Sequence, residues 1–168
     1  MAMDSFGIVG HAYRDGECLD ATNDDWYCYY LQGALDKDII PKEMIENCNV
    51  TKVTKTLAEA TDDKKAVTTD VNVYTGKFDG DKPITREEMA AIAVRCKNYK
   101  MRRLTDWDNE RRYPIFSFKD SDEIDEKYIS DVVEAYNLNY IDGMEDGRFA
   151  PKENLTRAQA AVVMNNLK

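Results

Sequence analysis

Two stretches of the chain repeat each other, and this repeat restricts the fold more than any other feature of the sequence. Residues 76–94 read GKFDGDKPITREEMAAIAV, and residues 147–164 read GRFAPKENLTRAQAAVVM. Phe78 and Phe149 each stand seven positions before the threonine of a Thr-Arg pair. Self-similarity of this kind predicts a fold built from two copies of one structural unit.

Each Thr-Arg pair is predicted to begin a helix. Thr85 is followed three positions later by Glu88, and Thr156 is followed at the same distance by Gln159. This is the spacing of a capping box, in which the two side chains satisfy free amides of the first turn. The apolar residues that follow recur at helical spacing and are predicted to face the core. They are Met89, Ile92, Ala93 and Cys96 in the first copy, and Ala160, Val163, Met164 and Leu167 in the second.

The likeness continues upstream, where each copy is predicted to contain an earlier helix that begins with an aromatic residue. The matching positions are Trp26, Gly33 and Ile39 in the first copy and Tyr128, Ala135 and Ile141 in the second. The chain is therefore divided into an N-terminal segment (1–18), a first unit (19–96), a basic connector (97–114) and a second unit (115–168).

The first unit carries an insertion, at about residues 41–75, that the second unit lacks. In its first half, Val53 and Leu57 lie in rough helical phase. In its second half, Val67, Val71 and Val73 alternate loosely, which favours a short hairpin or an irregular strand. The predicted fold class is therefore mainly α, with helical-hairpin repeats and a possible small β-hairpin in the insertion.

Composition excludes several classes of function. The chain has 32 acidic and 23 basic residues, a net charge of -9, which argues against a nucleic-acid binder. It has no apolar run of about 18 residues, so no membrane span is expected. With a single histidine, His11, and no CxxC spacing among the four cysteines, neither a zinc site nor a catalytic constellation is indicated. We expect no enzymatic activity, no cofactor and no metal; Cys96 is predicted to be a buried apolar residue, and disulfides among the other cysteines are left open.

The two arginines of the repeat are unusual. Arg86 and Arg157 lie in the first turn of a predicted helix, where the helix dipole disfavours a cation by a few tenths of a kcal/mol up to about 1 kcal/mol. Two interpretations remain open. Free helix amides together with a guanidinium would suit a carboxylate or phosphate ligand. Alternatively, each arginine forms a salt bridge to a nearby acid, such as Asp20, Asp120 or Glu87.

A calcium loop is a further alternative in the second unit. Between Asp142 and Glu153 the sequence DGMEDGRFAPKE places acids and a glycine at several positions of an EF-hand loop. Met144, however, occupies position 3 of the loop, which normally provides a ligand, and its side chain offers no oxygen. The first copy does not keep this ligand pattern, so the repeat is built around the helix start.

The segment FKDSDEIDEKYISDVVEAYNLNYIDGMEDGRFAPKENLTRAQAAVVMNNL resembles an S-layer homology motif. The resemblance rests on Phe118, Asp120, Tyr128, the turn 141–143, and the DGRFAP and LTRAQAA stretches. The segment from about 19 to 95 resembles a more divergent copy. The family implies a pseudo-threefold helical bundle, usually of three motifs, outside the cell at the cell wall or S-layer. It also implies non-covalent binding to an acidic secondary cell-wall polysaccharide in grooves between motifs.

The resemblance also suggests ligand-binding residues, which are Arg157, Arg86, Asp120, Asp20, Trp26, Tyr128 and Gly143. No third Thr-Arg helix is visible, so a third motif would come from the insertion, from another chain, or not at all. The expected partners are therefore the polysaccharide and other S-layer homology-like motifs or a second chain. The alternative is a protein-protein interaction or self-assembly module. Glycan binding requires the arginines to be open to solvent, whereas assembly predicts that they are buried or bridged.

Overall fold

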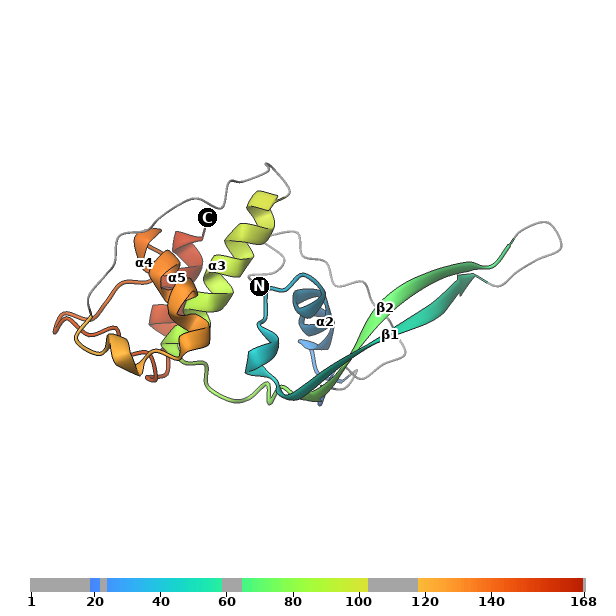
Figure 1. Cartoon of the computed structure of the whole chain (residues 1–168), viewed down its shortest axis with the longest axis horizontal. Helices are drawn as coiled ribbons and strands as arrows, with labels where there is room; N and C mark the ends of the chain where they lie inside the picture. The colour runs from blue at the N-terminus through green and yellow to red at the C-terminus, as the bar shows by residue number, and fades with distance from the viewer. Residues whose placement is uncertain (1–18, 22–23, 59–64, 103–117, 168) are drawn as a thin grey trace.

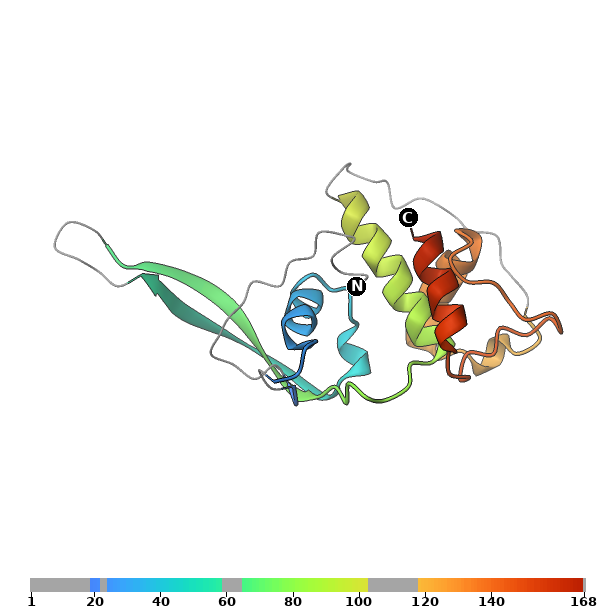
Figure 2. The same cartoon turned by 180° about the vertical axis from the view of Figure 1, so that it is seen from behind.

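The computed structural model describes residues 19–21, 24–58, 65–102 and 118–167. In the described parts, four α-helices, three short 3-10 helices and two strands follow one another along the chain (Figure 1). They are α2 (Cys28–Asp36), η1 (Lys42–Met44), β1 (Glu46–Ala58), β2 (Val67–Lys77), α3 (Arg86–Arg102), η2 (Ser121–Glu123), η3 (Glu126–Tyr128), α4 (Ile129–Asn137) and α5 (Arg157–Asn166). Helices α3, α4 and α5 pack together, α2 lies between them and the sheet, and the two strands project away from the bundle (Figures 1 and 2).

The predicted fold class, mainly α, is wrong: the fold is a mixed α/β arrangement with an antiparallel two-stranded sheet. Both halves of the insertion form strands, including the half in which a helix was considered. Val53 lies opposite Val71 and Thr51 opposite Val73. The segment TKVTKT is rich in β-branched residues, which favour extended backbone over helix. The resulting strands have 13 and 11 residues, so the hairpin is much larger than expected.

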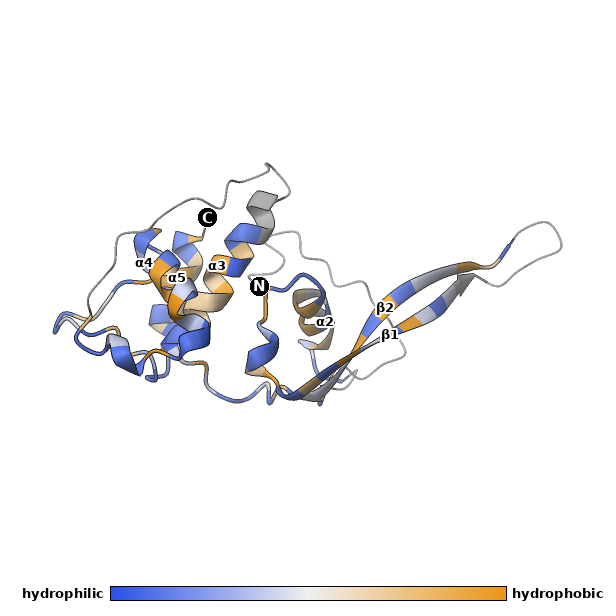
Figure 3. Ribbon diagram, viewed as in Figure 1, coloured by the Kyte–Doolittle hydropathy of each residue, from blue (hydrophilic) through white to orange (hydrophobic). Residues whose placement is uncertain are grey.

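The largest apolar cluster lies where α3, α4 and α5 meet. Its most enclosed members include Ala93, Val94, Val132, Ala135, Phe149 and Leu167. Ile84 and Leu155, the residues before the two helix starts, pack against this cluster. A second cluster, formed mainly by Ala21, Leu31, Ile45 and Tyr74, joins α2 to the base of the hairpin. Along the hairpin, in contrast, apolar residues are interrupted by hydrophilic ones (Figure 3).

Both predicted capping boxes are confirmed. The Glu88 amide donates to Thr85 Oγ1 at 3.3 Å, and the Thr85 amide donates to Glu88 Oε2 at 2.9 Å. Thr156 and Gln159 make the same reciprocal pair, at 3.2 and 2.9 Å. Each hydroxyl thereby satisfies one of the amides that a helix start leaves without a partner.

The cysteines of the described segments carry free thiols. Cys96 is 3% exposed on α3, which confirms the prediction that it is a buried apolar residue. Cys28 and Cys48 are also unpaired, and Cys18 lies outside the described residues. Among the described helices, none is long and apolar enough to cross a bilayer.

The structure shifts the alignment of the two earlier helices by one residue. Helices α2 and α4 each have nine residues and follow Tyr27 and Tyr128, respectively. Two positions after each helix, Asp38 and Asn139 adopt the same left-handed backbone conformation, with φ of 56° and 55°. Tyr27, rather than Trp26, is therefore the structural counterpart of Tyr128.

Candidate functional site: the joint between the two motifs

The opening acid of each motif holds the loop that leads to the second helix of the same motif. Asp120, which is 6% exposed, accepts hydrogen bonds at 2.8 Å from the amides of both Phe149 and Ala150. Ala150 has a φ of 58°, so the loop turns sharply here. The carboxylate thus fixes the path of the loop, and both of its oxygens are engaged.

Asp20 does the same in the first motif. It accepts from the amides of Phe78 and Asp79 at 2.6 and 2.9 Å, and Asp79 has a φ of 57°. Partial burial would raise the pKa of Asp20, but the two amides outweigh it and lower this pKa below its usual value. The two loops are therefore built in the same way.

Arg86 is buried between the motifs, with 4% of its surface exposed. Its Nε donates to the carbonyl oxygen of Phe149 at 2.7 Å, and Nη2 donates to the carbonyl oxygen of Asp142 at 2.6 Å. The guanidinium also lies over the Phe149 ring, 5.1 Å from its centre. Burial lowers the pKa of Arg86, while the nearby carboxylates of Glu153, Asp120 and Asp142 oppose this effect.

Backbone hydrogen bonds reinforce this contact. The Arg86 amide donates to the carbonyl of Glu153 at 3.0 Å, and the Glu87 amide donates to that of Pro151 at 3.2 Å. In the opposite direction, the Leu155 amide donates to the Ile84 carbonyl at 3.1 Å. We call these contacts between residues 84–87 and the loop 142–155 the motif joint. The amides at the start of α3, which were candidates for an anionic ligand, are occupied by protein carbonyls.

A buried acid also belongs to the motif joint. Glu87, which is 3% exposed, accepts from Lys152 Nζ at 2.6 Å and from the Asp125 amide at 3.0 Å. Lys152 also pairs with the Asp125 carboxylate at 2.8 Å, and this hydrogen bond lowers the pKa of Asp125. Lys152 therefore links a residue of the first motif to two segments of the second.

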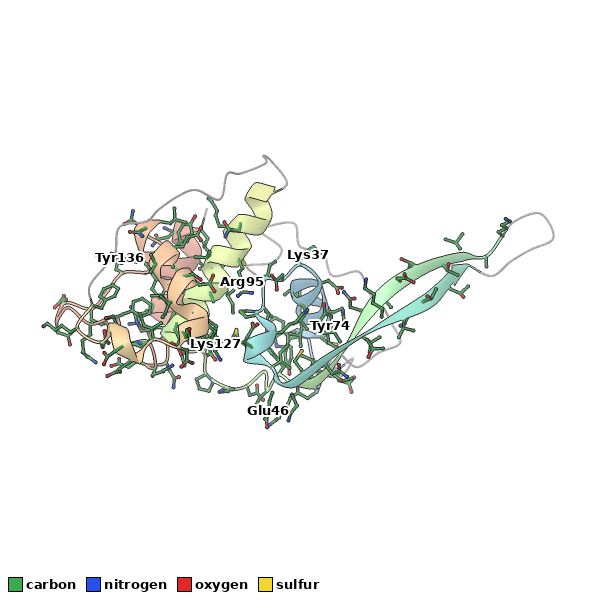
Figure 4. The ribbon with its side chains drawn as sticks, in the orientation of Figure 1. Lys37, Glu46, Tyr74, Arg95, Lys127 and Tyr136 are labelled. Carbon is green, nitrogen blue, oxygen red and sulfur yellow. The ribbon has the colours of Figure 1, made fainter. Side chains whose placement is uncertain are left out.

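Arg95, halfway along α3, provides another link (Figure 4). Its guanidinium lies 3.5 Å from a carboxylate oxygen of Asp38 and 3.4 Å from one of Asp131. Asp38 follows α2 and Asp131 lies on α4, so this side chain connects both motifs. Sequence reasoning assigned no role to Arg95 or Lys152, because the two copies of the repeat carry different residues at these positions.

Arg157 has the same place in the repeat as Arg86 but a different environment. It is exposed at the start of α5, and the described part of the chain provides no recorded partner for its guanidinium. The first turn of α5 contains no acid, whereas that of α3 contains Glu87 and Glu88. Of the two repeat arginines, Arg157 is thus the one that faces solvent.

The remaining predicted site residues do not converge on one pocket. Tyr128 is 2% exposed, and its hydroxyl is buried without a hydrogen-bond partner among the described residues. Trp26 is 76% exposed and touches Tyr27 edge-on. At Gly143, an added Cβ would lie 2.6 Å from the Phe118 ring, so this glycine permits close packing of the turn.

The calcium alternative is not favoured by the geometry of its loop. Asp146 and Glu153 both direct their carboxylates to Arg148, at 2.8 and 3.2 Å. These two acids are therefore already paired with one arginine of the same loop.

Comparison with known proteins assigns the second motif. Residues 117–161 match the family model described as the S-layer homology domain. The second motif is therefore similar to the S-layer homology domain, a non-catalytic module that anchors proteins at the cell surface; the match covers 117–161 and not the rest of the chain. This match agrees with the predicted location at the cell wall or S-layer.

Three curated relatives extend the comparison. The chain is 37% identical over 102 residues to an endoglucanase of Bacillus sp. (strain KSM-635), covering 58% of this chain and 10% of the relative. It is 39% identical over 84 residues to an amylopullulanase of Thermoanaerobacterium thermosulfurigenes, covering 50% and 4%. It is 30% identical over 170 residues to the exoglucanase XynX of Acetivibrio thermocellus, covering 99% and 12%. The chain thus spans about an eighth or less of each relative. No solved structure matches it.

Proposed function

We propose that this chain is a non-catalytic module that anchors a surface polypeptide to an acidic secondary cell-wall polysaccharide. The observation that carries the proposal is the exposure of Arg157 at a capped helix start, inside the segment that matches the S-layer homology family. The enzyme names of the relatives concern much longer proteins. In the proposal, this chain contributes attachment and not catalysis.

The start of α5 has the chemistry to hold a carboxylate of an acidic sugar. A guanidinium can make two parallel hydrogen bonds to a carboxylate, and the positive end of the helix dipole adds to the attraction. The exposed indole of Trp26 could stack on a sugar ring elsewhere on the polymer. Asp20, Asp120 and Gly143 would support the site indirectly, because they shape loops.

Arg86 has a different role in this proposal. Its donors are used by Phe149 and Asp142, so it holds the two motifs together rather than contacting the polymer. In this proposal Arg157 contacts the polysaccharide. Its removal should therefore weaken binding to the polymer, whereas removal of Arg86 should lower stability.

The test is a pull-down with Gram-positive sacculi, before and after acid extraction of the attached polymers. We expect the chain to bind intact sacculi, to lose binding after extraction, and to lose binding in Arg157→Ala. Arg148→Ala, which removes another exposed arginine, serves as the matched control and should bind normally. Equal binding to intact and extracted sacculi would contradict the proposal.

A second candidate function is protein-protein interaction or self-assembly. The observation that favours it is Arg86, because this repeat arginine is buried against a loop of protein. Arginines that are buried or bridged are what an assembly module requires.

A further inference from the structure

The motif joint uses one half of each motif and leaves the other half unused. In the joint, the helix start of the first motif docks on the loop of the second. The helix start of the second motif, at Arg157, and the loop of the first motif, at Phe78, have no such counterpart in the described chain. We propose that these two unused halves join copies of this chain head to tail, with the α5 start of one copy seated on the Phe78 loop of another.

The donor half of the proposed contact is the start of α5, and it repeats the residues at the start of α3 that form the motif joint. Thr156 and Arg157 repeat Thr85 and Arg86, and both helices start with a complete capping box. Arg157 is exposed, as the unused counterpart of a docking residue would be. The amides of Arg157 and Ala158 correspond to the two α3 amides that donate to the loop carbonyls of the second motif.

The acceptor half, or acceptor loop, is the loop at Phe78, and it has the same construction as the loop on which Arg86 docks. Asp20 holds the Phe78 loop as Asp120 holds the Phe149 loop. The following turn also repeats: the Lys82 amide donates to the Asp79 carbonyl at 2.8 Å, as the Glu153 amide donates to that of Ala150 at 3.1 Å. By this correspondence, the carbonyls of Phe78, Gly80 and Lys82 take the places of those of Phe149, Pro151 and Glu153, which are three of the four that accept from Arg86 and Glu87.

The exposure of the two phenylalanines differs as this inference requires. Phe149 is fully buried, with the Arg86 guanidinium over its ring. Phe78 is only half-buried and packs against Tyr27 at 6.3 Å between ring centres. A guanidinium from a second copy would cover the face of Phe78 that solvent now reaches.

The charges of the two halves are complementary. In the joint, Glu87 faces Lys152. In the proposed contact, the corresponding residues are Ala158 and Asp81, so the helix start lacks the acid that Asp81 would repel. Asp79 and Asp81 are both exposed on the Phe78 loop, whereas the start of α5 has no acid. Lys77 pairs with Asp79 at 3.3 Å, so Asp81 is the acid of this loop that an incoming Arg157 would meet.

This contact and the proposed polysaccharide contact use the same guanidinium, but neither depends on the other. A bound polymer would compete with a second copy for Arg157. The two proposals separate at the acceptor loop, because a variant of this loop should lose self-association and keep any binding to sacculi.

Sedimentation velocity across a range of protein concentrations tests the inference. We expect the mean mass of the wild-type chain to rise with concentration. The dissociation constant of Arg157→Ala should be at least about tenfold higher than that of the wild type. Phe78→Ala and the surface variant Asp79→Lys should weaken association similarly, with far-UV circular dichroism confirming the fold. Arg148→Ala is the control and should associate as the wild type does.

Mixing the variants gives the sharpest outcome. Arg157→Ala keeps the acceptor loop and Asp79→Lys keeps the donor helix, so an equimolar mixture should form heterodimers at concentrations at which each variant alone stays monomeric. A wild-type chain that stays monomeric at every concentration would overturn the inference. So would association that survives Arg157→Ala, or a mixture that remains monomeric. Sacculus binding by Asp79→Lys, measured in parallel, reports on the polysaccharide proposal alone.

Discussion

Arg86 and Arg157 follow the same threonine in the same repeat, but their side chains experience different surroundings. Arg86 is enclosed by protein and donates to two carbonyl oxygens, whereas Arg157 faces solvent. A buried guanidinium with satisfied donors holds its neighbours in place, because its removal leaves buried carbonyls without partners. An exposed guanidinium has no such structural cost.

Arg86→Ala should lower the free energy of unfolding by about 2 to 3 kcal/mol, the range for hydrogen bonds to a charged group. Arg157→Ala should change it by less than about 0.5 kcal/mol, as for exposed positions in general. Urea denaturation followed by circular dichroism measures both. If the two substitutions destabilise equally, the structural role assigned to Arg86 is wrong.

Asp20 provides a pH-dependent contribution to stability. Its pKa is lowered in the folded chain because the ionised carboxylate accepts from the Phe78 and Asp79 amides. A lowered folded pKa means that the stabilisation is complete above the usual value of 3.8 and is lost as pH falls further.

We therefore expect the wild-type chain to lose more stability than Asp20→Asn when pH falls from 5 to 3. The asparagine variant should be less stable at pH 7 and show a flatter pH profile in this interval. The measurement is the urea midpoint at each pH. Parallel profiles for the two proteins would mean that Asp20 does not contribute in this way.

At the level of the elements, the helix starts were the best predicted features. The Thr85 and Thr156 capping boxes follow from residues three positions apart, and such local hydrogen bonds need no knowledge of the tertiary fold. The hairpin was harder to predict. Its strands are stabilised by pairing with each other, and the pairing of Val53 with Val71 is not visible in either segment alone.

Removing either cap should lower stability by about 1 kcal/mol. Thr156→Ala and Thr85→Ala both delete the hydroxyl that accepts from the first turn. Thr→Ser at the same positions keeps this oxygen and should cost much less, which makes serine the matched control. Thermal or urea unfolding of the four variants checks the prediction, and an equal loss for serine would point to the methyl group instead of the cap.

The outer hairpin should be dispensable for stability. The Thr54 hydroxyl donates to the Asp70 carboxylate in an exposed position. Tyr74, at the base, is instead 4% exposed and packs in the cluster under α2. Replacing residues 54–70 by an Asn-Gly turn should change the free energy of unfolding by less than about 0.5 kcal/mol.

In contrast, Tyr74→Ala should cost about 3 kcal/mol, because it empties a packed aromatic site. Burial and the neighbouring Asp36 also raise the pKa of Tyr74 to about 12, as expected for an enclosed hydroxyl (Figure 4). A large loss of stability on trimming the outer strands would show that they support the rest of the chain.

For the molecule as a whole, the motif joint and Arg95 should make the two motifs unfold together. Calorimetry of the wild-type chain should give a single transition whose calorimetric and van't Hoff enthalpies agree. Arg86→Ala should separate it into two transitions, or lower the enthalpy ratio from unity. Two transitions in the wild type would mean that the joint does not couple the motifs.

From the sequence one can read the repeat, its helix starts and the likeness of the second motif to the S-layer homology family. The partner of Arg86 cannot be read in this way. The sequence reasoning considered an external anion or a carboxylate, because such partners are recognisable from residue types. The actual acceptors are the carbonyls of Phe149 and Asp142, which every residue possesses. Only the path of the backbone identifies them.

This use of main-chain acceptors has a consequence for how such chains can diverge. Substitution at Asp142 need not disturb its bond to Arg86, since the accepting oxygen does not belong to the side chain. Loops of different composition can thus accept the same arginine, provided that an acid such as Asp120 fixes the path of their backbone. Motifs with little residue identity could be exchanged between proteins and still fit together.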